Sequence, residues 1–388
     1  MEVLTNSQRF INAGRVTRQD VTKALDHVIQ QIDINIDLLN GQFPEPSTVN
    51  NTYPVMGNTE WTNGFWTGML WLAYEYTGQD KYRQVAMQNV ASFTERIDKK
   101  LNVDHHDLGF LYSPAVVSAY RLTGDEAAKQ TAIKAADQLL TRYNPKGQFI
   151  QAWGKKGDTT ENRLIIDALL NIPLLYWASE VTGEDKYRDI ANHHYQTAIH
   201  TVFREDGSTF HTYFFDENGK PLHGATRQGY ADDSDWARGQ AWGIYGTALH
   251  YYDTHDATSF AQFESVTNYY LNRLPEDDVP YWDLIFQDGS GQSRDTSASA
   301  IAVCGMNEML KSMPESSDFK WIYQAAMHAQ LKGLIHNAAP IQQAVGPLLL
   351  HGVYSWHSDH GVDEGNLWGD YFYMEALMRF DRDWLLYW

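Results

Sequence analysis

The chain has 388 residues, of which 43% are hydrophobic and 20% are charged, and its formal net charge is −19. This acidic balance argues against a nucleic-acid or anionic-membrane partner, because like charges repel. Cys304 is the only cysteine, which excludes an internal disulfide and a cysteine-based zinc site and fits a reducing compartment. The first residues lack the apolar core of a signal peptide, and no stretch approaches the roughly 20 apolar residues of a membrane span. We therefore expect a cytoplasmic protein whose partner is a small molecule.

A repeated phrase runs through the first half of the chain. Apolar runs with helical period begin at Gly64, Gly109 and Leu164, and each run ends in Thr-Gly with an acidic residue within the next two positions. Glycine suits the left-handed position that closes a helix, and the acidic residue suits the first turn of the next helix. Each phrase therefore predicts a pair of helices, an αα-hairpin.

Three looser copies of the run begin at Asp235, Asp295 and Glu364. The six runs are spaced by roughly 45 to 70 residues, which is room for two helices and a loop. Six helix pairs can close into a ring, so we expect an all-α fold, an (α/α)6 barrel, with residues 1–388 forming a single catalytic domain. The alternative is an open α-solenoid, whose repeats are shorter and more regular. One β-hairpin is expected near residues 208–224, where turn residues separate alternating apolar positions.

The first candidate for chemistry stands at the start of an inner helix, where a closed ring would form a cavity. Asp107 follows His105 and His106 directly and precedes an apolar run. Aspartate is a typical N-cap, so capping is one interpretation of Asp107, and a catalytic role is the other. Histidine and aspartate also ligate zinc, but three adjacent side chains do not converge on one ion without strain, so we expect no metal.

The second candidate is Asp167, which lies within the apolar run IIDALLNIPLLYW. Capping does not explain an aspartate in the middle of such a run. Apolar neighbours remove water from a carboxylate and raise its pKa, which favours the protonated form that a general acid needs. The alternative is a buried aspartate that is hydrogen-bonded to a neighbouring helix. Pro173 in the same run is expected to kink the helix.

The remaining candidates are a cation, two polar side chains and two indole rings. Arg238 and Trp242 are four residues apart, so they share a helix face on which a guanidinium can stack on a ring. An inward-facing arginine suits a bound carboxylate, although core packing alone also explains Trp242. His211 and Gln228 are candidate partners for sugar hydroxyls. Trp61 is expected to form a stacking platform for a sugar, whereas the other tryptophans of EWTNGFWTGMLW are expected in the core.

Together these residues indicate a carbohydrate pocket, and four stretches also carry a resemblance to a known family. The stretches are WTNGFWTGMLWLAYEYTG, HHDLGFLYSPA, NRLIIDALLNIPLLYWA and QGYADDSDWARGQAWGIYG, in this order and with compatible spacing. They resemble the signature stretches of the unsaturated glucuronyl hydrolases, family 88 of the glycoside hydrolases. The resemblance extends from about Trp61 to the segment DEGNLWGDYFYMEAL and implies an (α/α)6 barrel with no metal or organic cofactor.

The resemblance implies an unusual reaction. Members of this family act on lyase-generated oligosaccharides, such as unsaturated glycosaminoglycan disaccharides, whose non-reducing end is a uronic acid with a C4=C5 double bond. They hydrate this vinyl ether instead of attacking the anomeric carbon. Asp167 matches the family's general acid and base, and Asp107 matches its second carboxylate. The family's remaining substrate contacts match Trp61, His106, His211, Gln228, Arg238 and Trp242.

One stretch bears on specificity. Residues 354–366, YSWHSDHGVDEGN, resemble a loop that contacts a sulfate on the neighbouring amino sugar in some family members. Ser355 and Ser358 match the hydroxyl groups of that contact. His360 stands where a lysine is expected in sulfate-preferring relatives, and its charge is partial near neutrality. Sulfated disaccharides and unsulfated, hyaluronan-like disaccharides therefore both stay open as substrates.

Three alternatives to this function stay open. The first is the related family that acts on unsaturated rhamnogalacturonan disaccharides with the same barrel. The second is a non-catalytic carbohydrate-binding α-toroid, which would gain nothing from a desolvated acid. The third is a conventional inverting glucanase, which needs two carboxyl groups about 6.5–9.5 Å apart. In each case we expect a monomer or weak homodimer.

Overall fold

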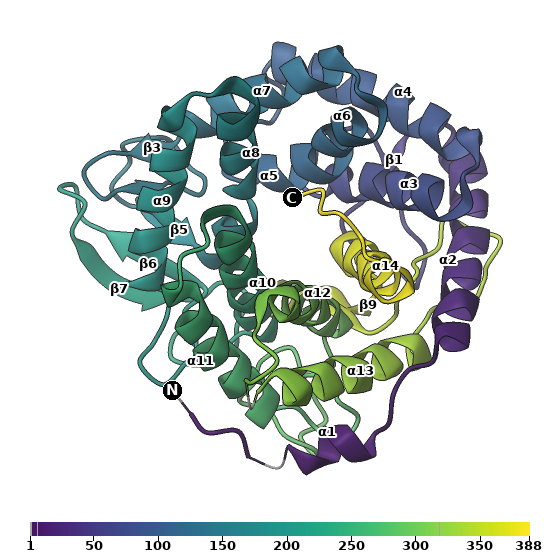
Figure 1. Cartoon of the computed structure of the whole chain (residues 1–388). Coiled ribbons are helices and arrows are strands. Elements are labelled where there is room, and N and C mark those ends of the chain that lie inside the picture. The colour runs from purple at the N-terminus through teal and green to yellow at the C-terminus, as the bar shows by residue number, and fades with distance from the viewer. Residues whose placement is uncertain (1, 6, 318) are drawn as a thin grey trace.

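The computed structural model describes residues 2–5, 7–317 and 319–388, and its helices alternate between outer and inner positions around a ring (Figure 1). The outer helices are α2 (Arg18–Leu39), α4 (Asp80–Asp98), α7 (Glu126–Leu140), α9 (Asp185–Ile199), α11 (Thr258–Asn272) and α13 (Lys320–His336). The inner helices are α3 (Asn63–Thr77), α5 (Leu108–Tyr112) with α6 (Ser118–Thr123), α8 (Pro173–Thr182), α10 (Ala237–Thr254), α12 (Thr296–Ser312) and α14 (Leu367–Asp381). The short helix α1 (Gln8–Asn12) packs against α13. The predicted (α/α)6 barrel is confirmed.

Burial explains why the sequence patterns of inner and outer helices differ. In the inner helix α14, every residue from Leu367 to Arg379 is buried. In the outer helix α4, seven of 19 residues are buried, and they recur at helical spacing from Tyr82 to Ile97. An inner helix therefore reads as a continuous apolar run, whereas an outer helix is amphipathic. Within the described residues, the structure contains no helix with the length and hydropathy that crossing a membrane requires.

The predicted helix ends are confirmed at three glycines. Gly78, Gly124 and Gly183 follow α3, α6 and α8 with φ angles of 69°, 71° and 73°, respectively. The backbone N–H of each donates to the carbonyl group four residues earlier, which satisfies one of the unpaired carbonyls at the helix end. Because L-residues with a side chain rarely adopt this conformation, glycine suits these positions. Asp80 then lies in the first turn of α4, as predicted.

The predicted β-hairpin is present, and the structure adds short strand pairs that the sequence analysis did not predict. Strands β6 (Thr212–Phe215) and β7 (Pro221–Ala225) form the antiparallel hairpin, and β5 (Arg163–Ile165) pairs with β6. The other antiparallel pairs are β1 (Phe43–Pro44) with β2 (Val55–Met56), β3 (Tyr143–Asn144) with β4 (Phe149–Ile150), and β8 (Gly352–Ser355) with β9 (His360–Glu364). Strands of two to five residues leave too little alternation for a pattern to detect.

The segment around Asp167 differs from the predicted kinked helix. Residues Ile166–Leu170 form a 3-10 turn, and α8 begins afterwards, with Pro173 in its first turn. Proline suits this position because the N–H that it lacks would have no partner in the first turn of a helix. Pro173 therefore starts a helix, and the prediction of a kink was wrong. On the neighbouring inner element, Ser113–Val117 is a π-helical segment between α5 and α6.

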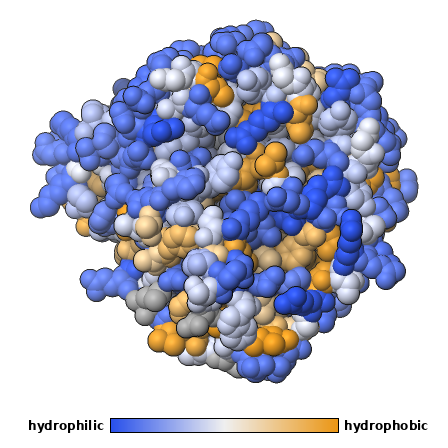
Figure 2. All heavy atoms as spheres, viewed as in Figure 1, coloured by the Kyte–Doolittle hydropathy of each residue, from blue (hydrophilic) through white to orange (hydrophobic). Residues whose placement is uncertain are grey.

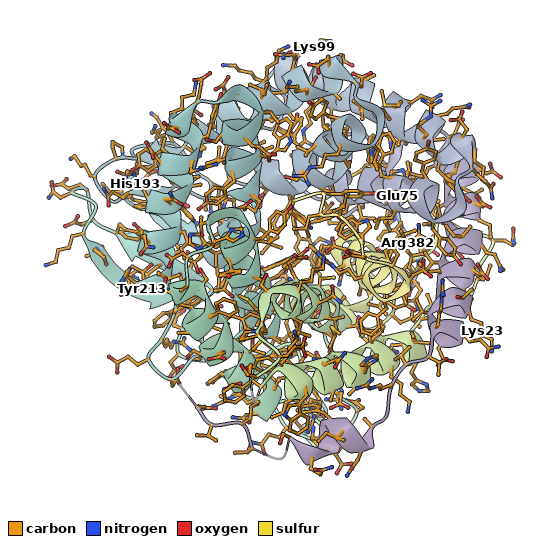
Figure 3. The ribbon with its side chains drawn as sticks, in the orientation of Figure 1. Lys23, Glu75, Lys99, His193, Tyr213 and Arg382 are labelled. Atoms are coloured by element: carbon orange, nitrogen blue, oxygen red, sulfur yellow. The ribbon has the colours of Figure 1, made fainter. Side chains whose placement is uncertain are left out.

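The inner helices share one direction, and the last residues of the chain close the end of the ring at which these helices finish. Figure 1 shows the C-terminus inside the ring, and Figure 2 shows a mostly hydrophilic surface on this face with small hydrophobic patches. Arg121 of α6 donates to the carbonyl groups of Leu386 and Trp388. Glu75 and Arg382 lie on the same face, to the right of its centre in Figure 3, and the Arg382 guanidinium donates to the Glu75 backbone carbonyl oxygen at 3.0 Å. A pocket is therefore expected at the opposite end of the ring, where the inner helices begin.

Candidate active site

A cavity of about 660 Å³ opens where the inner helices begin. This volume is in the range of about 300–1,000 Å³ that is typical of small-molecule sites. The predicted site residues all line it except His106, and His360 lines it too. The cavity wall also contains five residues that the sequence analysis did not single out, namely Trp153, Arg227, Trp236, Tyr354 and His357.

Three side chains meet at one wall of the cavity. Nε2 of His106 lies 3.3 Å from Oδ1 of Asp107 and 3.5 Å from Oδ1 of Asp167. One nitrogen or oxygen atom from each of the three residues lies within 4.8 Å of the others. His105, in contrast, directs its Nε2 to the carbonyl group of Asn102 at 2.9 Å. The three grouped side chains are close enough to share an ion, so the expectation of a metal-free site stays a prediction.

The two carboxyl groups differ in protonation. Burial raises the pKa of Asp167 well above its usual value, and the nearby charge of Asp107 raises it further. Burial acts in the same direction on Asp107, but the neighbouring imidazoles of His106 and His105 outweigh it and hold the pKa of Asp107 below its usual value. Burial lowers the pKa of His106 to about 4. These shifts favour a protonated Asp167 beside an ionised Asp107, and His106 is neutral near neutral pH.

The hydrogen bonds do not support the structural alternatives for these two aspartates. Asp107 occupies the N-cap position of α5, but its side chain caps no backbone N–H. Oδ1 of Asp167 has no hydrogen-bond partner in the described part of the chain, although the atom is buried. The side chain of Asp167 is 17% exposed and lines the cavity. An unpartnered, desolvated carboxyl group at a cavity wall is typical of a catalytic acid.

Asn171 fixes the spacing between the two aspartate segments. Its Oδ1 accepts the backbone N–H of Phe110 at 2.8 Å, and its Nδ2 donates to the backbone carbonyl of Asp167 at 3.2 Å. Gly109 allows this approach, because a Cβ atom added there would lie 2.3 Å from Cα of Asn171. The sequence therefore places a glycine where the Asp107 segment touches the Asp167 segment.

Arg238 lines the cavity but is buried and bonded within the protein. Its Nη1 donates to Oδ2 of Asp295 at 2.8 Å, and its Nη2 donates to the carbonyl oxygen of Tyr354 at 3.0 Å. Its guanidinium group stacks on Trp236 and Trp368 at 4.4 Å and 4.8 Å from the ring centroids. The predicted stacking of Arg238 on Trp242 was wrong, because rings from outside the helical i, i+4 pattern occupy both positions around the guanidinium.

The tryptophans of the stretch EWTNGFWTGMLW separate as predicted into one pocket ring and two core rings. Trp61 is half-buried, stacks on Trp368 at 5.3 Å and donates from Nε1 to the Tyr354 hydroxyl group at 3.0 Å. Trp66 and Trp71 of the same stretch are buried in the core. Trp242 reaches the cavity wall but is only 1% exposed, so most of its surface packs in the core.

Other polar residues of the cavity wall are oriented by hydrogen bonds. Nδ1 of His211 accepts the backbone N–H of Arg227 at 3.0 Å, and burial lowers the pKa of His211 to about 3. The imidazole is therefore neutral and carries its proton on Nε2. Nε2 of Gln228 donates to the Tyr354 carbonyl at 2.9 Å, and the Ser358 hydroxyl group donates to that of Ser355 at 2.8 Å.

The comparisons with known proteins agree with this geometry. Residues 35–346 match the model of Glycosyl Hydrolase Family 88. The chain belongs to this family. The family 88 resemblance predicted from the four stretches is confirmed, and the chain is a glycosidase.

Individual relatives of this family 88 glycosidase match over nearly their full length. The unsaturated chondroitin disaccharide hydrolase of Streptococcus pneumoniae is 55% identical over 100% of this chain and 98% of its own. The unsaturated glucuronyl hydrolase of Bacillus sp. strain GL1 is 41% identical over 91% and 95%. The crystal structure of the unsaturated glucuronyl hydrolase of Streptococcus agalactiae superposes with a TM-score of 0.98, at 55% identity over 100% of this chain and 98% of that chain. A mutant of that hydrolase in complex with dGlcA-GalNAc6S gives a TM-score of 0.91, at 52% identity and the same coverage.

Proposed function

We propose that this family 88 glycosidase releases the unsaturated uronic acid from the non-reducing end of lyase-generated glycosaminoglycan disaccharides. It does so by hydrating the C4=C5 vinyl ether, with Asp167 as general acid and base. The relatives named above as unsaturated chondroitin disaccharide hydrolase and unsaturated glucuronyl hydrolase support this substrate class. The matches to these two relatives cover 100% and 91% of this chain, respectively.

The observation that carries the proposal is the pairing of a desolvated Asp167, whose buried Oδ1 has no hydrogen-bond partner among the described residues, with an Asp107 whose pKa is lowered. Protonating the carbon of an enol ether requires a poorly hydrated acid beside the alkene, which the buried Asp167 provides. The positive charge that develops at C5 is shared with the ring oxygen, and the Asp107 carboxylate stabilises it. An oxygen atom of each carboxyl group lies within 4.8 Å of the other, which is closer than the roughly 6.5–9.5 Å spacing of an inverting glucanase.

The reaction needs one acid and base that serves twice. Asp167 gives its proton to C4 while water adds at C5, and the Asp167 carboxylate then takes a proton from that water. The resulting hemiketal at C5 opens to a ketone, and its proton passes to the ring oxygen. The anomeric carbon, now a hemiacetal, releases the reducing-side sugar. Asp167 ends protonated, ready for the next cycle.

The other cavity residues hold the substrate in this proposal. Trp61 offers a ring face to the sugar, and the neutral His211 offers an Nε2 proton to a hydroxyl group. Arg238 supplies the buried positive charge for the uronate carboxylate, although much of its hydrogen-bonding capacity is used by Asp295 and the β8 carbonyl groups. His106 does not line the cavity and instead lies beside both carboxyl groups, so its predicted contact with the sugar stays a prediction.

The experiment follows the ultraviolet absorbance of the conjugated uronate over a panel of disaccharides. The panel contains sulfated and unsulfated chondroitin disaccharides, the hyaluronan disaccharide and an unsaturated rhamnogalacturonan disaccharide. We expect loss of absorbance together with release of the amino sugar, and incorporation of solvent deuterium at C4 in heavy water. Sugar release with intact absorbance would indicate ordinary glycoside cleavage and contradict the proposal. Turnover of the rhamnogalacturonan disaccharide alone would favour the related family, and binding without turnover would favour a non-catalytic toroid.

We further propose that residues 1–388 act as one catalytic domain and that the protein is a cytoplasmic monomer or weak homodimer. Packing of α14 against α2 and α3 supports the single domain, because it joins the last inner helix to the first helices of the ring. Sedimentation velocity at several protein concentrations and cell fractionation test the remaining points.

A further inference from the structure

An aromatic cluster that the proposed reaction does not use lies beside the cavity. The indole of Trp356 lies on that of Trp282, with 5.0 Å between ring centroids and 9° between ring planes. Tyr230 packs edge-on against Trp282 at 6.3 Å and against Phe286 at 5.2 Å. We call these four residues the aromatic ledge. Trp282 is buried, whereas Trp356 is 37% exposed and Tyr230 is 48% exposed.

The aromatic ledge continues directly from the rim of the cavity. Trp356 precedes His357, which lines the cavity, and Tyr230 comes two residues after Gln228, which also lines it. Nε2 of His357 donates to the carbonyl oxygen of Gly229 at 2.7 Å, which ties the two segments together. Each segment therefore contributes side chains to the cavity wall and one exposed ring beside it.

The proposed function indicates which part of a substrate extends out of the cavity past this rim. A glycosidase that removes the non-reducing residue holds that residue next to Asp167, so the rest of a longer oligosaccharide must extend out of the mouth. The net charge of −19 repels the anionic groups of a glycosaminoglycan, but the C–H face of a pyranose ring stacks on an uncharged indole. Trp282 already holds Trp356 in a parallel stack, so little side-chain entropy is lost on binding.

Resting on the proposed function, we propose that the aromatic ledge is a subsite for the sugar residue that follows the disaccharide on its reducing side. Its ligand is a pyranose ring of a tetrasaccharide or longer chain, bound through stacking on Trp356. The ledge makes the enzyme bind partly degraded oligosaccharides more tightly than disaccharides, without changing the chemistry at Asp167.

The test compares a disaccharide with the matching tetrasaccharide from a partial lyase digest. In Trp356→Ala, we expect kcat/KM for the tetrasaccharide to fall about 5- to 20-fold through KM, because one stacking contact is lost. We expect the disaccharide value to stay within about twofold, and Trp356→Phe to restore most of the loss. Trp321→Ala is the matched control, since Trp321 is 50% exposed on the outer helix α13.

Three outcomes would overturn the subsite. They are an equal loss for both substrates in Trp356→Ala, an unchanged tetrasaccharide value, and an equal loss in Trp321→Ala. Failure of the proposed function is distinguishable, because wild-type protein would then remove the double bond of neither unsaturated substrate. In that case, calorimetric titration with the tetrasaccharide still tests the ledge, and equal affinities of wild type and Trp356→Ala would overturn it.

Discussion

At the end of the barrel where the inner helices finish, buried charges are paired with one another. Arg379 donates to Glu308 at 2.7 Å, to Glu375 at 3.0 Å and to the Tyr245 hydroxyl group at 2.6 Å. The second carboxylate oxygen of Glu375 accepts Nε1–H of Trp388 at 3.0 Å. Burial favours the neutral form of Glu308, but Arg379 and Lys311 together outweigh it and keep the pKa of Glu308 below its usual value.

At the end where the inner helices begin, buried polar groups are left without partners. Oδ1 of Asp167 and both ring nitrogens of His106 have no hydrogen-bond partner in the described part of the chain. Desolvation there keeps Asp167 protonated instead of pairing it with a cation. Both ends bury ionisable groups, so burial does not by itself distinguish an active site. The difference is that a cavity, and not another side chain, lies beside the reactive oxygen.

The largest effect is expected for Asp167→Asn, which keeps the shape of the side chain and removes its acidic proton. We expect kcat to fall by about 10³- to 10⁴-fold with substrate binding retained, because the general acid is lost. Since the pKa of Asp167 is raised in the folded state, wild-type stability falls as pH rises from the unfolded pKa through the folded one. The melting temperature of the Asn variant near neutral pH should therefore equal or exceed that of wild type.

The checks for this variant are steady-state kinetics, calorimetric titration and thermal unfolding. Asp233→Asn is a suitable control, because Asp233 is exposed and does not line the cavity. A near-normal kcat in Asp167→Asn would place the acid elsewhere.

The opposite pattern is expected at the closed end. Arg379→Ala leaves the buried Glu375 without its counter-charge and Glu308 with Lys311 alone, which should cost about 3–5 kcal/mol of unfolding free energy. Arg379 lies near the C-terminal end of α14, whereas the cavity lies where the inner helices begin. The folded fraction of the variant should therefore keep kcat/KM within about twofold. Urea unfolding and kinetics at 25 °C measure both quantities. Arg379→Lys retains the charge and should lose less stability, so it decides the matter if the Ala variant does not fold. A reduced kcat at unchanged stability would contradict the separation of the two ends.

The sequence predicted the barrel because its defining signals are local. Each Thr-Gly phrase ends a helix through a glycine with positive φ. The six apolar runs correspond to the six inner positions of the ring. Asp107 and Asp167 could be found for the same reason, since each stands at an unusual place in an apolar run. The 3-10 turn before Pro173 could not be predicted from the spacing of apolar residues. The turn has only five residues, and their pattern fits an α-helix equally well.

The contacts that the sequence could not predict join distant elements. Arg238 finds its partners in Asp295, which caps α12, and in Trp368 of α14, so the spacing to Trp242 gave no information about them. Trp153 and Arg227 reach the cavity from loops, where no periodicity marks them. Trp236 lies in the stretch QGYADDSDWARGQAWGIYG and Tyr354 in YSWHSDHGVDEGN. Their aromatic side chains were the only feature of the sequence that could have indicated a place in the cavity wall.

A smaller effect is expected on the pH dependence of kcat/KM, which depends on both aspartates. Activity should fall at high pH as Asp167 loses its proton and at low pH as Asp107 gains one, about tenfold per pH unit beyond each limb. These limbs belong to the coupled pair. The charge of Asp107 helps to raise the pKa of Asp167, so the residual activity of Asp107→Asn should show its alkaline limb at lower pH than wild type. Arg379→Lys, at the closed end, should leave both limbs in place. The alkaline limb would contradict this prediction if it stayed fixed in Asp107→Asn or moved equally in Arg379→Lys. Either result would mean that Asp107 does not raise the pKa of Asp167.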